Sequence, residues 1–226
     1  MKIVPGPDEF AFVAARVVDP SPVRPYLGLP KRLFDLMLAV VLLPSVLPVV
    51  IFLAMVVRRD GGPAFFAQAR VGRGGRLFRC WKIRTMATDA EERLRQLCAG
   101  DPEVAREWHE HHKLRHDPRI TRIGQFLRRT SLDELPQLFN ILKGEMSFVG
   151  PRPVTLAELD RYGDHLVHYL SVRPGLTGLW QVSGRNDVSY AARVRLDVEY
   201  CTRASLPLDM GIITRTGLMV LRMTGR

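Results

Sequence analysis

The feature of this sequence that most constrains its fold is an uncharged, apolar run over residues 36–57 (LMLAVVLLPSVLPVVIFLAMVV). Its length matches the roughly 20 residues that an α-helix needs to cross the hydrocarbon core of a bilayer. The run begins too far from the N-terminus, and is too long, for a cleavable signal peptide. It therefore predicts attachment to a membrane, and a core helix of a soluble protein is the least favoured interpretation.

Basic residues stand at both ends of this run. Lys31 and Arg32 precede it, and Arg58 and Arg59 follow it. Because cytoplasmic loops of membrane proteins carry an excess of Lys and Arg, both ends have the charge expected on the cytoplasmic side. The symmetry favours a re-entrant helix, which enters and leaves the membrane on the same face. The alternative is a kinked helix that spans the membrane.

Two prolines, Pro44 and Pro48, lie near the middle of the run. Each removes one helical hydrogen bond and bends the helix axis. The carbonyl groups freed at the bend need partners inside a bilayer, and Ser45 is a nearby candidate. The run is therefore predicted to form a helix that proline breaks within the membrane.

The rest of the chain shows two kinds of secondary-structure pattern. β-Type residues around a glycine-rich turn predict a hairpin over residues 64–84. Residues 87–116 are helical in composition and highly charged, which is typical of a surface helix or lid. Helical periodicity returns at residues 188–202 and 207–223. The second of these suits a helix lying on the membrane surface as well as it suits an ordinary core-packed helix.

These patterns predict an α+β protein that is mostly helical. We expect a proline-rich leader over residues 1–30, the membrane helix over residues 31–59, and a cytoplasmic α/β region over residues 60–226 whose C-terminal helices lie at the membrane interface. The chain carries 33 Lys and Arg against 23 Asp and Glu, a net charge of +10. Such an excess favours nucleic acid, an anionic membrane surface or phosphorylated substrates, and does not choose among them.

The stretch RRTSLDELPQLFNILKG, residues 128–144, carries the strongest chemical signal. Its apolar residues recur with helical spacing and predict a helix with one buried stripe, which comprises Leu135, Leu138, Phe139 and Leu142. Gly144 follows the last of them and suits a left-handed C-cap. Pro136 is comfortable only in the first helical turn, so the helix is expected to start near Leu132 or Asp133.

The acidic pair at this helix start, Asp133 and Glu134, has two interpretations. Ser131 and Glu134 match a capping box, and acidic residues are favourable at a helix N-terminus. With Ser131 as the N-cap, however, Pro136 would lie too deep in the helix. The second interpretation is chemical, because free N–H groups at a helix start bind phosphate and adjacent carboxylates among arginines suit Mg²⁺ and a phosphorylated ligand.

Arginines frame the acidic pair on both sides. Arg128 precedes it, and Arg152 follows it between Pro151 and Pro153, which fix the backbone. A preorganised guanidinium is a good phosphate clamp, although a rigid turn with an incidental arginine also explains the pattern. The loop-rich stretch over residues 173–187 (RPGLTGLWQVSGRND) could recognise a nucleotide or a sugar, while turn chemistry explains its glycines equally well.

Five ordered motifs resemble those of the bacterial sugar transferase family of monotopic phosphoglycosyl transferases. The motifs are KRLFD (residues 31–35), KIRTM (82–86), SLDELPQ (131–137), GPRP (150–153) and RPGLTG (173–178). The resemblance runs from about Lys31 to the C-terminus. Within the family, the chain looks like the exopolysaccharide-initiating galactose- or glucose-1-phosphate transferases. The better-known family pattern has Ser-Pro at the membrane break, where this sequence has Leu47-Pro48.

The resemblance implies an enzyme that moves a hexose-1-phosphate, galactose being favoured over glucose, from a UDP-hexose to undecaprenyl phosphate and releases UMP. Asp133 would attack the β-phosphorus of the donor and carry the phosphosugar, so that one transfer between two awkward substrates becomes two steps. Mg²⁺ would be the cofactor, bound by Asp133 and Glu134. The catalytic region would lie on the cytoplasmic face of the bacterial inner membrane.

The same resemblance assigns further residues to the substrates. Phosphate groups would bind Arg128 and Arg152, with weaker candidates at Lys82 and Arg84. The loop over residues 173–187 adds Arg173, Gln181 and Arg185. The expected partners are UDP-hexose, a polyprenyl phosphate and the bilayer, with no nucleic acid, and a homodimer is left open. The alternative function is a basic membrane-surface protein that binds without chemistry, which gives the acidic pair no task.

Overall fold

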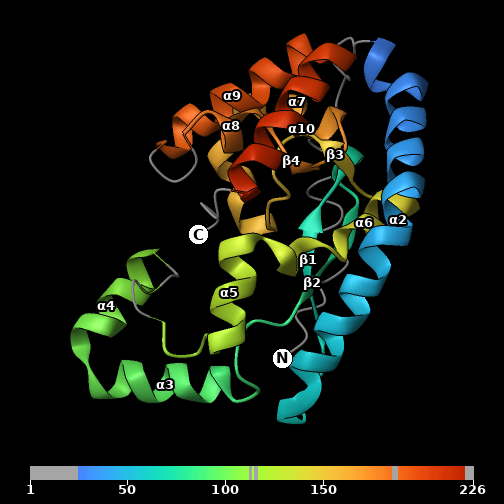
Figure 1. Cartoon of the computed structure of the whole chain (residues 1–226). Coiled ribbons are helices and arrows are strands. Elements are labelled where there is room, and N and C mark those ends of the chain that lie inside the picture. The colour runs from blue at the N-terminus through green and yellow to red at the C-terminus, as the bar shows by residue number, and fades with distance from the viewer. Residues whose placement is uncertain (1–24, 112–113, 115–116, 185–187, 222–226) are drawn as a thin grey trace.

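One long helix, α2 (Leu29–Val57), runs along one side of the molecule (Figure 1). The computed structural model describes residues 25–111, 114, 117–184 and 188–221. A short 3-10 helix, η1 (Pro25–Leu27), precedes α2, and another, η2 (Arg58–Asp60), follows it. Within the described ranges, residues 29–60 form the one helical segment that is long and apolar enough to cross a membrane. The path of this helix through a bilayer stays a prediction.

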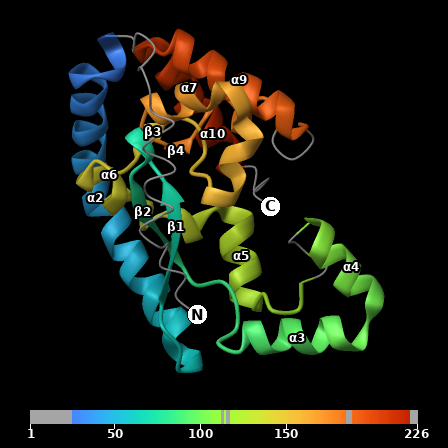
Figure 2. The ribbon, with the colours of Figure 1, turned by 180° about the vertical axis from the view of Figure 1, so that it is seen from behind.

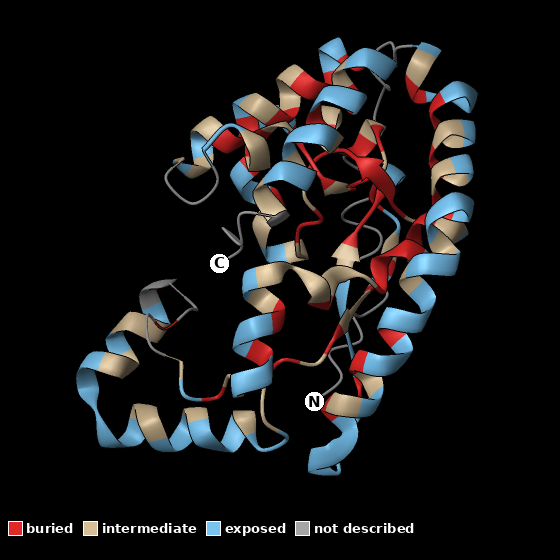
Figure 3. Cartoon of the chain, in the orientation of Figure 1, coloured by how far each residue is buried: buried red, intermediate tan, exposed pale blue. Residues whose placement is uncertain are grey.

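Pro44 and Pro48 lie inside α2, which bends but is not interrupted (Figures 1 and 2), because a proline removes only its own N–H donor. The buried residues of α2 fall into two groups, Lys31, Asp35 and Ala39 in the first half and Val50, Leu53 and Val57 in the second. No residue between positions 40 and 49 is buried (Figure 3). Both halves of the helix therefore pack on the same protein body, while its proline-containing middle presents apolar side chains outward.

The predicted hairpin is confirmed. Strands β1 (Phe65–Val71) and β2 (Leu77–Ile83) pair antiparallel around the 3-10 turn η3 (Arg73–Gly75). A second, two-stranded sheet was not predicted, and it joins β3 (Ser147–Val149) to β4 (Gly175–Thr177) in parallel. This small sheet brings together the two loops that contain GPRP and RPGLTG.

Helices build most of the remaining described chain. Two charged helices form an arm beside the body (Figures 1 and 2), namely α3 (Ala90–Gly100) and α4 (Pro102–His111). α3 buries no residue, in agreement with the surface helix predicted there. The C-terminal helices are η5 (Leu156–His165), α7 (Leu166–Ser171), α8 (Leu179–Val182), α9 (Tyr190–Arg203) and α10 (Leu206–Leu221). The two helices predicted near the C-terminus are thus confirmed as α9 and α10.

A buried ionic network fixes the first half of α2 to α10. Lys31 Nζ lies 2.7 Å from Asp209 Oδ2 and 3.3 Å from Asp35 Oδ1, and none of these side chains is more than 4% exposed. Asp35 Oδ1 also accepts hydrogen bonds from Ser147 Oγ at 3.0 Å and from Phe148 N at 3.1 Å. Moving α2 away would leave an uncompensated buried charge, which is strongly unfavourable. The network therefore fixes α2 against α10 and β3.

The segment around Asp133 differs from the single helix expected there. α5 (Arg122–Thr130) ends at Ser131, the 3-10 turn η4 (Leu132–Glu134) carries both acidic residues, and α6 (Gln137–Lys143) follows. Ser131 has a φ of 58°, the left-handed conformation that ends α5, and its side chain caps nothing. The capping box between Ser131 and Glu134 is therefore wrong. The prediction of Gly144 as a left-handed C-cap is confirmed by its φ of 81°.

The buried side of α6 also differs from the expected apolar stripe. Phe139 is 38% exposed, whereas the polar Asn140 is fully buried. Asn140 Nδ2 donates to Arg79 O at 2.8 Å, and its Oδ1 accepts from Trp81 N at 3.2 Å. A polar side chain occupies this core position because it satisfies backbone groups along the edge of β2, and the helix consequently turns Phe139 outward.

Candidate active site

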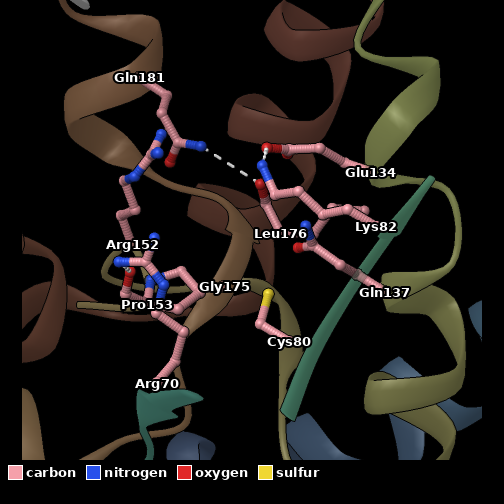
Figure 4. A pocket seen from close by; sticks show the side chains of 10 residues that line it. All are labelled: Arg70, Cys80, Lys82, Glu134, Gln137, Arg152, Pro153, Gly175, Leu176 and Gln181. Carbon is pink, nitrogen blue, oxygen red and sulfur yellow. Dashed lines mark hydrogen bonds and ion pairs between the residues drawn. The ribbon is translucent and has the colours of Figure 1, made fainter. Parts of the chain in front are cut away.

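A pocket lies between the hairpin, the start of α6, the loop after β3 and the β4–α8 segment (Figure 4). In this view one side carries Arg70, Arg152 and Gln181, and the other carries Lys82, Glu134 and Gln137. The remaining lining residues are Cys80, Pro153, Gly175 and Leu176. Four of the residues singled out in the sequence therefore meet in one place: Lys82, Glu134, Arg152 and Gln181.

Glu134 forms an ion pair with Lys82, which projects from β2. The distance from Lys82 Nζ to Glu134 Oε1 is 2.6 Å. Burial acts to raise the pKa of Glu134, but the positive charges of Lys82, Arg152 and Arg70 outweigh burial and hold that pKa below its ordinary value. Glu134 is therefore a fixed negative charge at neutral pH.

The neighbouring carboxylate of Asp133 has the opposite electrostatic character. Its side chain is 10% exposed, and its Oδ2 lies 3.9 Å from Lys82 Nζ. Burial is the main cause that raises the pKa of Asp133 to about 6; the charge of Glu134 adds to the rise, and Lys82 and Arg128 oppose it. At neutral pH Asp133 is thus an ionised but poorly solvated carboxylate, which is the state that a nucleophile requires.

Arg128 approaches this carboxylate from α5. Its Nε donates a 2.9 Å hydrogen bond to Thr85 Oγ1, beyond the end of β2. α5 packs closely on the same residue, since a Cβ added to Gly124 would lie 1.9 Å from the carbonyl oxygen of Thr85. Thr85 therefore sets both the position of the helix and the direction of its guanidinium.

The loop that carries Arg152 is held by the parallel pair β3–β4. Its backbone approaches the RPGLTG loop so closely that a Cβ added to Gly175 would lie 2.1 Å from Gly150 N. Gly150 N also donates to Thr177 O at 2.9 Å. The glycines of these two motifs are thus needed for close packing, and the packing fixes Arg152 at the wall of the pocket.

Other predicted residues lie elsewhere. Arg84 donates to the carbonyls of Pro63 and Met86, both at 2.7 Å, and so ties the hairpin to the segments on either side of it. Arg173 Nε donates to Gly144 O at 2.8 Å, at the C-terminal end of α6. Neither side chain lines the pocket. Ser45 is exposed on α2, and Arg185 lies outside the described residues.

Three lining residues, Arg70, Cys80 and Gln137, had no predicted role. Strand periodicity could have indicated Cys80, because it lies two residues before Lys82 on β2 and alternate residues share a face. The hairpin register, which sets Arg70 opposite Phe78 and Gln68 opposite Cys80, then brings Arg70 near the same face. The sequence therefore contained a signal for Arg70, but reading it required the pairing register of the hairpin as well as the alternation of faces along each strand.

The acidic pair also fits the proposed metal. Among the described residues, no group of three or more His, Cys, Asp or Glu side chains could enclose a metal ion. Mg²⁺ is usually held by one or two carboxylates together with substrate phosphates and water, rather than by a complete protein cage. Asp133 and Glu134, beside a basic pocket, are a donor set of that kind.

Comparison with known proteins identifies relatives of the chain. A family model described as bacterial sugar transferase matches residues 26–223. Undecaprenyl-phosphate galactose phosphotransferase from Salmonella typhimurium is 51% identical over 195 residues, which cover 86% of this chain and 41% of that protein. Exopolysaccharide production protein ExoY from Rhizobium meliloti is 48% identical over 195 residues, and the match covers 86% of each chain.

A glucose-linked relative is also similar. Undecaprenyl-phosphate glucose phosphotransferase from Komagataeibacter xylinus is 39% identical over 225 residues, which cover 92% of this chain and 39% of that protein. The chain thus spans about two fifths of the length of the Salmonella and Komagataeibacter proteins. It spans most of the Rhizobium protein.

Proposed function

Because this chain belongs to the bacterial sugar transferase family, we propose that it moves a hexose-1-phosphate from a UDP-hexose to undecaprenyl phosphate and releases UMP. The observation that carries the proposal is the pair of adjacent carboxylates with opposite pKa shifts beside a basic pocket. Titratable neighbours whose surroundings separate their pKa values are typical of residues with different chemical roles. The printed names of the Salmonella and Komagataeibacter relatives supply galactose and glucose as the first sugars to test.

The proposed reaction has two steps at one phosphorus atom. An oxygen of the Asp133 carboxylate attacks the β-phosphorus of the UDP-hexose, and the bond from that phosphorus to the bridging oxygen breaks. UMP leaves with the electron pair, and the hexose phosphate remains on Asp133. A phosphate oxygen of undecaprenyl phosphate then attacks the same phosphorus and frees the carboxylate. Covalent catalysis of this kind divides one difficult transfer into two easier ones.

The basic side chains around the acidic pair provide the electrostatic part of catalysis. Arg152 and Lys82 line the pocket, and Arg128 carries its charge toward Asp133. Fixed positive groups at a phosphate stabilise the charge that builds up on its oxygens during transfer. When Mg²⁺ is bound by Asp133 and Glu134, it would neutralise phosphate charge in the same way.

Membrane attachment through α2 would bring this site close to its lipid substrate. α2 presents its apolar middle outward and carries Lys31, Arg32, Arg58 and Arg59 at its two ends. This distribution supports a re-entrant helix, with the catalytic body on the cytoplasmic face of the bacterial inner membrane. A lipid carrier whose phosphate lies at the membrane surface could then reach the pocket without leaving the bilayer.

The proposal is tested by measuring UMP release by the purified full chain in a membrane mimetic. UDP-galactose and UDP-glucose are supplied with and without undecaprenyl phosphate and Mg²⁺. We expect UMP release that depends on carrier and metal, and a loss of on the order of 10³-fold or more in Asp133→Asn. Asp164→Asn is the matched control, since Asp164 is exposed and distant in sequence from the acidic pair Asp133 and Glu134. Release of UDP instead of UMP would overturn the reaction class.

A further inference from the structure

Arg70, on β1, lies in the wall of the pocket on the same side as Arg152 (Figure 4). The charged residues that line this pocket are Arg70, Lys82, Arg152 and Glu134. Three cations and one carboxylate thus line the pocket, but Arg70 forms an ion pair with Glu158 and Lys82 forms one with Glu134. Arg152 forms no ion pair with a described residue, so its charge is the one that a bound anion would balance.

The guanidinium of Arg70 is held in a fixed position. Its Nη1 lies 3.2 Å from Glu158 Oε2 and donates to Pro153 O at the same distance, and its Nη2 donates to Gln68 Oε1 at 2.7 Å. Glu158 is itself fixed, because the same Oε2 accepts hydrogen bonds from Thr155 N and Thr155 Oγ1. The side chain of Arg70 is 15% exposed. It is therefore preorganised by Glu158 and Gln68, which do not line the pocket, and by the carbonyl group of Pro153, which does.

The contact with Pro153 joins the two arginines of this wall. Pro153 is the residue directly after Arg152, and Val71 N donates to Val154 O at 2.9 Å, so the end of β1 runs along the loop that carries Arg152. Burial and then the charge of Arg152 lower the pKa of Arg70, as expected for two like charges on one wall of the pocket. A phosphate bound at that wall would offset their repulsion.

We propose that Arg70 is a phosphate-binding residue, which together with Arg152 receives a phosphate group of a substrate. The phosphate can belong to the nucleotide donor or to the lipid acceptor, and the two share the same chemistry. The inference rests on the proposed function only for the identity of these substrates. Glu158 acts as a positioning residue, since it orients Arg70 from outside the pocket.

The experiment measures binding directly, with the full chain in nanodiscs and without catalysis. Titrations with UDP and with undecaprenyl phosphate are carried out on the wild type and on Arg70→Gln. We expect Arg70→Gln to raise the Kd for at least one of the two ligands about tenfold or more, because a charge-assisted pair with phosphate is lost. Arg76→Gln is the matched control, since Arg76 lies on the same hairpin, is exposed and carries the same charge.

A second variant separates phosphate binding from folding. Arg70→Lys keeps the charge but loses the planar fork, so it should lose less stability than Arg70→Gln. It should bind less tightly than wild type and more tightly than Arg70→Gln. If the Kd for UDP rises more, Arg70 binds a phosphate group of the nucleotide donor. If the Kd for undecaprenyl phosphate rises more, Arg70 binds the phosphate group of the lipid acceptor. If Arg70→Gln and Arg76→Gln bind both ligands as the wild type does, the proposal is overturned.

The same titrations distinguish this inference from the proposed reaction. If the wild-type protein binds UDP through Arg70 but releases no UMP, the proposed transferase function is contradicted and the phosphate-binding role of Arg70 is supported. Conversely, UMP release by Arg70→Gln with the wild-type KM, together with unchanged binding, would keep the reaction and remove Arg70 from it.

Discussion

Lys82 Nζ lies 2.6 Å from Glu134 Oε1, while its distance to Asp133 Oδ2 is 3.9 Å. The ammonium group of Lys82 therefore lies closer to Glu134 than to Asp133. The pKa of Glu134 is lowered, with Lys82 as its nearest positive charge, whereas burial raises the pKa of Asp133 to about 6. The 3-10 turn η4 makes this possible, because it places the two carboxylates at different distances from the same ammonium group. The unequal distances separate a permanent charge from a carboxylate that can react.

The raised pKa of Asp133 predicts an acid limb in the pH profile. Asp133 must be ionised to attack phosphorus, so kcat/KM for UMP release should fall below pH 6 by about tenfold for each pH unit. Asp197 is a necessary control, because its pKa is also raised to about 6, mainly by burial. We expect Asp197→Asn to keep the midpoint of the wild type. A flat profile between pH 5 and 8 would contradict the role of Asp133.

Removal of the Lys82 charge should move this limb to higher pH. Lys82 opposes the rise in the pKa of Asp133, so Lys82→Gln raises that pKa further and leaves more of the carboxylate protonated at pH 7. We expect lower activity at pH 7 and partial recovery as the pH is raised, measured as kcat/KM across the range. Lys143→Gln, an exposed lysine on α6, is the matched control. A midpoint that moves downward would show that Lys82 does not act on Asp133.

Loss of the Thr85 hydroxyl should misdirect Arg128. Thr85→Val removes the acceptor of the Arg128 Nε hydrogen bond and keeps the shape of the side chain. We expect kcat/KM to fall about tenfold and the unfolding temperature to fall modestly, since a hydrogen bond from a charged, partly buried group is lost at the site. Thr85→Ser keeps the hydroxyl and should retain activity. Equal losses in Thr85→Val and Thr85→Ser would indicate a packing effect instead.

Both ends of α2 should be accessible from the cytoplasmic face only. Lys31 pairs with Asp209, and Leu53 packs with Ile83 and Leu127, so both halves of the helix contact one body. We expect Leu29→Cys and Arg59→Cys to react with a membrane-impermeant maleimide in inside-out vesicles and not in right-side-out cells. Cys98→Ser provides the background, since Cys80 and Cys201 are buried. Reaction of Leu29→Cys from the outer face would establish a spanning helix.

Local patterns in the sequence predicted the elements whose stability is local. The apolar run, the hairpin and the two C-terminal helices were all visible as periodicity, because each is encoded within a continuous segment. The parallel pair β3–β4 was missed, since its three-residue strands are far apart in the chain and are joined by close backbone packing. That sheet is nevertheless what carries Arg152 to the pocket.

Predictions of individual site residues were limited in a similar way. An arginine in a sequence motif can face a substrate or a backbone carbonyl, and sequence spacing does not distinguish these two roles. Arg84 and Arg173 donate to carbonyl groups and do not line the pocket. Arg70, which belonged to none of the quoted motifs, also donates to a carbonyl group but does line the pocket. The burial of Asn140 could not be predicted either, because its hydrogen-bond partners are backbone atoms of β2, which sequence spacing does not reveal.

The network of Lys31, Asp35 and Asp209 means that α2 is not an interchangeable anchor. In a chimera that carries an unrelated hydrophobic helix in place of residues 29–57, Asp209 would be buried without its ammonium partner. Breaking a buried pair in this way costs about 3–5 kcal/mol, a large part of the roughly 5–15 kcal/mol that stabilises a typical domain. α2 and the body on which it packs must therefore be kept together when this protein is engineered.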